Sequence, residues 1–189
     1  FRAKTWTGLR CRLCPAAQEI HSAVRRCGRS QGQEGLVVRL LSDPLTTIPP
    51  MNGSFLELGG LDGVHQSNSL VLERCLGWRG LLVEANPLLA RRLCSNRPRA
   101  LSFAVGVCPA GQRRLRIAVP EGRWAAAGVP GLLQAEVQAQ HSKRNVTERD
   151  VPCAPLAELL DEAGFTHIDY LSLDVEVPYD MSANVCVRV

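Results

Sequence analysis

Aromatic side chains are scarce in this sequence, and long apolar runs are missing from it. Phe, Trp and Tyr make up 5% of the 189 residues, which leaves few platforms on which nucleic-acid bases could stack. No stretch approaches the ~20 apolar residues of a membrane-spanning helix, and the first residues lack the apolar core of a signal peptide. Because residue 1 is Phe rather than Met, the start of the sequence is uninformative about a targeting signal, and the localisation stays open.

Net charge is also nearly absent from most of the chain. The formal charge is +4, but residues 1–50 hold 8 Lys/Arg against 3 Asp/Glu, whereas residues 51–189 hold 14 against 15. The second region therefore offers no charge-based argument for nucleic-acid binding. The hydrophobic content of 46% and the length are those of one domain with its own core.

The cysteines show no regular spacing. This favours mostly reduced, partly buried thiols, with one or more disulfides as the alternative. A CxxC pair near the start, followed by His21 and another cysteine, offers four possible zinc ligands. Their spacing fits no standard zinc finger and no second CxxC follows, so we predict no metal site. The eight cysteines are Cys11, Cys14, Cys27, Cys75, Cys94, Cys108, Cys153 and Cys186.

Alternating strand and helix patterns begin after an Arg-rich, irregular segment over residues 1–52, which ends in a Pro- and Gly-containing linker. Residues 122–149 are compatible with an exposed helix or a mobile loop. The order of the elements predicts an α/β fold with a right-handed, mostly parallel, three-layer sheet. Expected strands cover 55–58, 80–84, 101–105 and 168–175, with a hairpin strand at 115–119; expected helices cover 67–76, a segment from Asn86-Pro87 onward, and 155–163.

The most informative local feature is a glycine-rich turn after the first expected strand. Gly59, Gly60 and Gly63 permit a tight turn that brings the backbone close to a ligand. Ser67 or Ser69 is placed to cap the helix that follows. A turn of this kind opens nucleotide-type pockets in α/β domains, although it also occurs in purely structural loops.

Carboxylates occur at the ends of three expected strands, where open α/β sheets bind ligands. Glu84 lies 25 positions after Gly59, near the offset at which an acidic side chain binds a ribose diol. This spacing suits a dinucleotide or S-adenosylmethionine. Glu57 favours the second, because a carboxylate directly before the glycines repels a pyrophosphate but attracts an ammonium and sulfonium group. The turn also lacks the G-x-G-x-x-G spacing of dinucleotide sites. Asp174 and Glu176 end the fourth strand.

Three ordered stretches resemble the FkbM family of S-adenosylmethionine-dependent methyltransferases over about residues 53–176. They are Phe55-Leu-Glu-Leu-Gly-Gly-Leu-Asp-Gly63 with Ser67-Asn68, Leu76-Gly-Trp-Arg-Gly-Leu-Leu-Val-Glu-Ala-Asn-Pro87, and Ile168-Asp-Tyr-Leu-Ser-Leu-Asp-Val-Glu176. The resemblance implies a Rossmann-like class I fold and O-methylation of a hydroxyl on a glycan or small metabolite. It implies cofactor contacts from Glu57, Gly59, Asp62, Gly63, Ser67, Asn68, Glu84, Asn86, Asp174 and Glu176.

The resemblance stops after Glu176, where residues 177–189 form a tail without family character. We therefore expect the sheet to break off after its fourth strand, and the activity of this exact chain becomes a question. A non-catalytic fragment or binding module is the first alternative, and a dinucleotide-binding oxidoreductase the second. No catalytic base is assigned; His65 and His141 are better explained as exposed loop residues. The sequons at Asn52 and Asn145 carry no weight for localisation at this stage.

Overall fold

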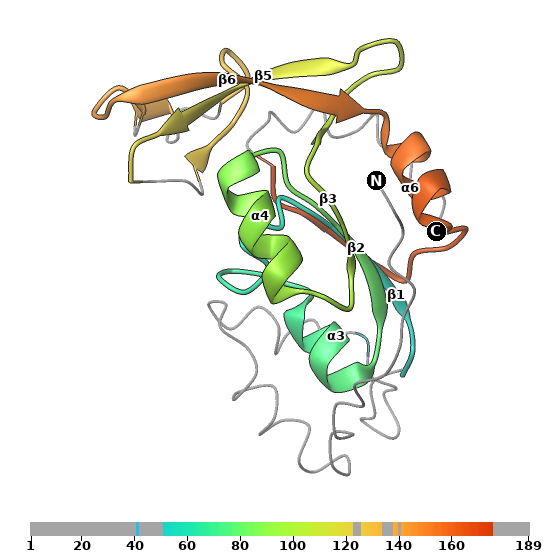
Figure 1. Cartoon of the computed structure of the whole chain (residues 1–189). Coiled ribbons are helices and arrows are strands. Elements are labelled where there is room, and N and C mark those ends of the chain that lie inside the picture. Colours follow the sequence, from blue (N-terminus) through green and yellow to red (C-terminus); the bar gives the residue numbers. More distant parts are fainter. Residues whose placement is uncertain (1–40, 42–50, 123–125, 134–137, 140, 176–189) are drawn as a thin grey trace.

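A parallel sheet forms the centre of the molecule. The computed structural model describes residue 41 and residues 51–122, 126–133, 138–139 and 141–175; the tail at 177–189 and nearly all of segment 1–52 lie outside them. Within these residues the central sheet has four strands in the order β3-β2-β1-β7, and every neighbouring pair is parallel (Figure 1). The strands are β1 (Ser54–Leu58), β2 (Arg79–Val83), β3 (Leu101–Phe103) and β7 (Tyr170–Leu173).

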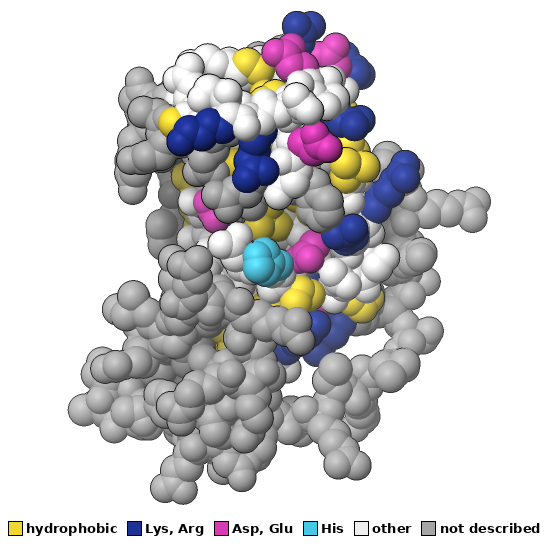
Figure 2. All heavy atoms as spheres, turned by 90° about the vertical axis from the view of Figure 1, so that its left-hand side faces the viewer, with side chains coloured by type: hydrophobic (Ala, Val, Ile, Leu, Met, Phe, Trp, Pro, Cys, Tyr) yellow, Lys and Arg dark blue, Asp and Glu magenta, His cyan; other side chains and the backbone are white. Residues whose placement is uncertain are grey.

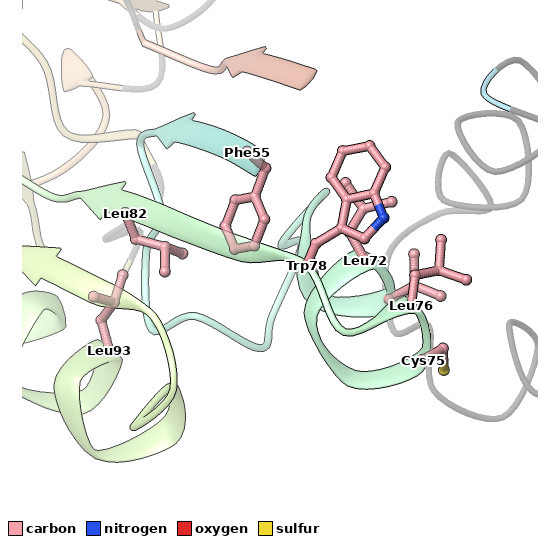
Figure 3. Packing of buried hydrophobic residues seen from close by; sticks show 8 residues of the cluster. Phe55, Leu72, Cys75, Leu76, Trp78, Leu82 and Leu93 are labelled. Atoms are coloured by element: carbon pink, nitrogen blue, oxygen red, sulfur yellow. The ribbon is translucent and has the colours of Figure 1, made fainter. Parts of the chain in front are cut away.

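Apolar side chains cover both faces of this sheet, because successive strand residues point to opposite sides. On one face Phe55 and Leu82 pack with α3 (Leu70–Leu76) and α4 (Pro87–Asn96), as Figure 3 shows for the cluster around Trp78. On the other face Leu56 and Leu81 pack with α6 (Leu156–Ala163). A mixed α/β architecture with a parallel sheet, as predicted, follows from this alternation.

The ends of the helices were largely predictable. Gly77 and Gly164 adopt the left-handed conformation directly after α3 and α6, as expected for glycine beyond a helix end. Asn86 accepts a hydrogen bond from the backbone N–H of Leu88 at the start of α4, and Pro87 follows it. The predicted cap of α3 is wrong, however. Ser69 precedes that helix without capping it, because its hydroxyl donates elsewhere.

A second, smaller sheet lies across one end of the central sheet (Figure 1). It contains β4 (Gly106–Val107), β6 (Val146–Ala154) and β5 (Arg114–Pro120) in that order, with β5 and β6 antiparallel. Strand β6 corrects the expectation of a helix or loop up to residue 149. Its buried positions, Val151 and Cys153, occur only in its second half, so the charged first half carries no alternating pattern in the sequence.

Ion pairs on the surface of this hairpin are exposed. Arg116 lies 3.6 Å from Glu148 and 3.5 Å from Asp150, and all three side chains are more than half exposed. Figure 2 shows basic and acidic side chains intermixed on one face of the molecule. Underneath, Ile117, Val119 and Val151 form a small buried cluster.

A disulfide joins Cys108, just after β4, to Cys153 in β6. The preference for reduced thiols is therefore wrong for this pair, and the alternative of at least one disulfide holds. The sequence could not reveal the pairing, because the two cysteines are 45 positions apart and only the register of β4 on β6 brings them together. The cysteine and histidine cluster near the start of the chain lies outside the described residues.

Two absences apply to the described part of the chain. It holds no group of three or more His, Cys, Asp or Glu side chains arranged to bind a metal ion. None of its helices is both long enough and apolar enough to span a membrane.

Candidate functional site

The glycine turn brings the carboxyl ends of β1, β2 and β7 together. Gly59 has a φ of +82°, and a Cβ at this position would overlap the carbonyl oxygen of Asp174. The backbone N–H groups of Gly59 and Gly60 both donate to the carbonyl of Val83, at 3.0 and 3.1 Å. Glycine is thus required at position 59 both by its left-handed conformation and by this close approach.

Glu57 organises the segment that follows the turn. Its carboxylate is 2% exposed and accepts hydrogen bonds from Ser67 Oγ at 2.9 Å, from the backbone N–H of Asn68 at 2.8 Å, and from Ser69 Oγ. Burial raises the pKa of Glu57, while these donors and the nearby Arg97 oppose the rise. The serines therefore fix β1 to the 67–69 segment rather than capping α3.

Arg97 completes this network, although no sequence pattern singled it out. Its fully buried guanidinium pairs with Glu73 at 2.5 Å. It also donates to the carbonyl of Gly63 at 3.0 Å, to Ser67 Oγ at 2.8 Å and to Ser69 Oγ at 3.1 Å. A buried charge needs such complete pairing. The residue sits directly after α4 in an Asn-Arg-Pro sequence, a context typical of a solvated helix end, which is why it was missed.

Glu84 holds the turn from the side of β2. Its carboxylate is 6% exposed and accepts hydrogen bonds from the backbone N–H groups of Leu61, at 2.9 Å, and Asn86, at 2.7 Å. Burial raises the pKa of Glu84 to about 7, against the effect of these two donors. Each carboxylate oxygen has two lone pairs and accepts one hydrogen bond from the described residues, so each has a second acceptor position that these residues do not use.

Unpaired buried polar atoms lie in the same part of the molecule. Within the described residues, Asn68 Oδ1 and Asn86 Nδ2 are buried and have no hydrogen-bond partner. The other half of each amide is used: Asn68 Nδ2 donates to Ser172 Oγ at 3.1 Å, and Asn86 Oδ1 caps α4. Because native proteins pair nearly all such atoms, a bound polar ligand would satisfy these two. The third such atom among the described residues, Ser102 Oγ, lies on β3.

Asp62 and Gly63 shape the remainder of the loop. Asp62 Oδ1 accepts from the backbone N–H groups of Val64, at 3.0 Å, and His65, at 2.7 Å. Gly63 has a φ of +77°, and the preceding Leu61 has a φ of +48°, which is rare for a residue with a branched side chain. Strained backbone of this kind clusters at ligand-binding loops.

Asp174 and the two histidines differ in their surroundings. Asp174 directly follows β7, its side chain is exposed, and partial desolvation raises its pKa. His65 is exposed on the loop, as expected. His141 is instead buried, with its ring Nε2 2.6 Å from the carbonyl of Ala126, so the expectation of an exposed loop residue is wrong. Glu176 lies outside the described residues.

The hairpin borders this site. Ala85, which directly follows Glu84, packs against the Ile117, Val119 and Val151 cluster of β5 and β6. Except for Glu176, all the site residues that the sequence predicted lie in or beside the loops at the carboxyl ends of β1, β2 and β7. The site therefore has a floor of strand ends and a second sheet at its side.

The comparison with protein families identifies the same region. The family model described as "Methyltransferase FkbM domain" matches residues 57–176, a stretch that begins at Glu57 and includes every strand from β2 to β7. No curated protein matches the chain, and no solved structure does.

Proposed function

The chain belongs to the FkbM methyltransferase family, and we propose that it uses S-adenosylmethionine to methylate a hydroxyl group of a glycan or small metabolite. The observation that carries this proposal is Glu84. It is a buried carboxylate at the end of β2 with a pKa raised to about 7 and with unused acceptor positions on both oxygens. Ribose hydroxyls are the donors that such a group accepts in nucleotide-type pockets.

The donor set fits the cofactor at both ends. At the ribose end, Asn86 Nδ2 supplies an unused donor beside Glu84. At the methionine end we assign the loop residues Gly59, Asp62, Gly63, Ser67 and Asn68, with Asn68 Oδ1 as an unused acceptor for an ammonium group. Glu57 contributes negative charge and holds the loop in place.

The chemistry of the transfer comes from the cofactor, whose sulfonium supplies an electrophilic methyl group. The contribution of the chain is to position the two reactants and to exclude water from between them. Asp174 and Glu176, at and after the end of β7, are the residues we assign to the side facing the cofactor or the acceptor hydroxyl. The β5–β6 hairpin, which packs against Ala85, is the element we assign to the acceptor wall.

Calorimetric titration of the purified chain with S-adenosylhomocysteine and, separately, with NAD tests the proposal. We expect binding of S-adenosylhomocysteine only. A preference for NAD would favour the oxidoreductase alternative, and binding of neither ligand would favour a non-catalytic binding module.

Substitution then locates the ligand. Glu84→Ala is expected to weaken S-adenosylhomocysteine binding by about 1–3 kcal/mol, since hydrogen bonds to a charged acceptor are lost. The matched control is Glu148→Ala, which removes an exposed carboxylate on β6 and should leave the affinity unchanged. If the two variants bind S-adenosylhomocysteine with equal affinity, Glu84 is not part of the binding site.

A further inference from the structure

An exposed glycosylation sequon begins strand β6. Asn145, Val146 and Thr147 are all exposed, and Asn145 directly precedes the first residue of the strand. The side-chain amide of Asn145 donates to Glu121 Oε2 at 3.2 Å on the surface. An Asn-x-Thr triplet is an acceptor for N-linked glycans when it is presented on the surface of a secreted protein. The accessibility condition is met here.

The disulfide in the same sheet supplies the second, independent observation. Cys153 lies in β6 with Asn145 just before that strand, and Cys153 is bonded to Cys108 beyond β4. Disulfides form and persist in oxidising compartments and are rare in the cytosol. One of these oxidising compartments, the lumen of the secretory pathway, is also where N-linked glycans are attached.

We propose that this protein folds in an oxidising secretory compartment and carries an N-linked glycan on Asn145. In the glycosylation step Asn145 Nδ2 loses a proton and forms a bond to the anomeric carbon of a lipid-diphosphate-linked oligosaccharide. The carbon–oxygen bond to the diphosphate breaks, and the lipid diphosphate leaves. In the oxidation step the thiols of Cys108 and Cys153 lose two protons and two electrons to a protein disulfide, which becomes a dithiol.

The hairpin surface accommodates the sugar. The glycosylated amide retains one N–H, so the hydrogen bond to Glu121 can persist. Thr147 pairs with Val119 through the backbone of β5, and its side chain remains exposed. The glycan therefore projects from the rim of the second sheet without displacing a buried group.

The other sequon is less favourable. The backbone N–H of Asn52 donates to the carbonyl of Leu76 at 3.1 Å, and Gly53 lies against the Trp78 ring. The Ser54 hydroxyl bonds to the carbonyl of His167 at 3.0 Å and to Asp169 Oδ2 at 2.8 Å. These contacts place the Asn52 triplet at a packed junction of the central sheet, and we assign the glycan to Asn145.

The test uses the full-length protein isolated from cells that make it, with free thiols alkylated at lysis. Peptide N-glycosidase treatment in heavy-oxygen water should convert Asn145, and not Asn52, to labelled aspartate detected by mass spectrometry. Cys94, which has a free thiol on the surface, should be alkylated at once, and Cys108 and Cys153 only after reduction. An unmodified Asn145, or immediate alkylation of Cys108 and Cys153, would each overturn the proposal.

Two conservative substitutions make the assignment specific. Thr147→Val should abolish the glycan because it removes the sequon hydroxyl, whereas Thr147→Ser should retain the glycan because it keeps that hydroxyl. Since Thr147 is exposed on a strand, both variants should fold. Loss of the glycan in both variants, or in neither, contradicts modification through this sequon.

Discussion

The loops at the carboxyl edge of the central sheet and the β5–β6 hairpin use charge in opposite ways. At the carboxyl edge, Glu57, Glu73 and Arg97 are almost completely buried. Arg97 pairs directly with Glu73 and is linked to Glu57 through the hydroxyls of Ser67 and Ser69. On the hairpin, ion pairs such as that of Arg116 with Asp150 are more than half exposed.

The difference shows where the fold concentrates its constraints. Exposed pairs contribute little to stability because water and salt screen them. Buried charges are costly unless every one is paired, and a fold that keeps several of them fixes the geometry of the backbone they contact. Here that backbone is the glycine loop. The hairpin is instead held by a disulfide and a small apolar cluster. Neither of these depends on the charged side chains at its surface.

Glycine-to-alanine substitution in both regions should give the largest contrast. Gly59→Ala is expected to cost about 5 kcal/mol or more, a diagnostically large loss, because the new Cβ meets a backbone carbonyl that cannot move aside. Gly111, in the turn before β5, also has a positive φ, but a Cβ there meets nothing within 4 Å. Gly111→Ala should cost only ~1 kcal/mol.

Urea denaturation of the two glycine variants measures the contrast. Similar losses of unfolding free energy would mean that the left-handed conformation alone, rather than contact with Asp174, requires glycine at position 59.

Removal of Arg97 should be nearly as severe. Arg97→Met is expected to cost about 3–5 kcal/mol, because it leaves the buried Glu73 carboxylate without its partner. Arg116→Met on the hairpin should cost at most ~1 kcal/mol. If the charge left behind is the cause, the double variant Arg97→Met/Glu73→Leu recovers part of the loss in unfolding free energy. No recovery would assign the loss to the hydrogen bonds with Gly63 and the serines.

The elements of the central sheet and the location of the site were predictable from the sequence, but the buried ion pair that holds the site was not. Short apolar runs and helical spacing located the parallel strands and the helices, and the colinear motifs located the site. These signals are local, and each depends on a few neighbouring residues. Arg97 and Glu73 escaped detection because their pairing spans 24 positions and connects two helices.

The hairpin was harder to predict for a related reason. The charged start of β6 at Val146 has no buried residue before Val151, so its strand character comes from pairing with β5 rather than from its own pattern. The Cys108–Cys153 bond depends on another long-range pairing, that of β4 with β6. Both the strand at the start of β6 and the disulfide therefore depend on pairing between strands that are far apart in the sequence.

Loss of the disulfide should weaken the hairpin side of the comparison. The two cysteines are 45 positions apart in the sequence. For a loop of this length, loop-closure entropy gives an upper value of about 4 kcal/mol for the stabilisation by the disulfide, and the expected range is about 2–4 kcal/mol. Cys108→Ser/Cys153→Ser should lower the urea midpoint accordingly. Cys94→Ser, which removes an exposed thiol, should leave the midpoint unchanged; an equal effect of both changes would show that the cross-link adds no stability.

Ionisation of Glu84 should have smaller effects, and these should run in opposite directions: the unfolding free energy should fall as the pH rises, and the affinity for the ligand should rise. Its pKa is about 7 in the fold against an ordinary 4.5, so the folded protein binds a proton more readily than the unfolded chain does. The contribution of Glu84 to the unfolding free energy therefore falls, by about 3 kcal/mol, as the pH rises from 4.5 to 7.

Ligand binding should follow the opposite trend at the same residue. Ribose hydroxyls donate to the ionised carboxylate, so the affinity for S-adenosylhomocysteine should rise as the pH rises through about 7. One pH unit below that value it should be roughly tenfold weaker than at a pH where Glu84 is fully ionised. Glu84→Gln removes the titrating group and should flatten the pH dependence of both quantities. Calorimetry and urea denaturation at matched pH values measure the pair, and an affinity that does not change with pH would show that Glu84 ionises without contacting the ligand.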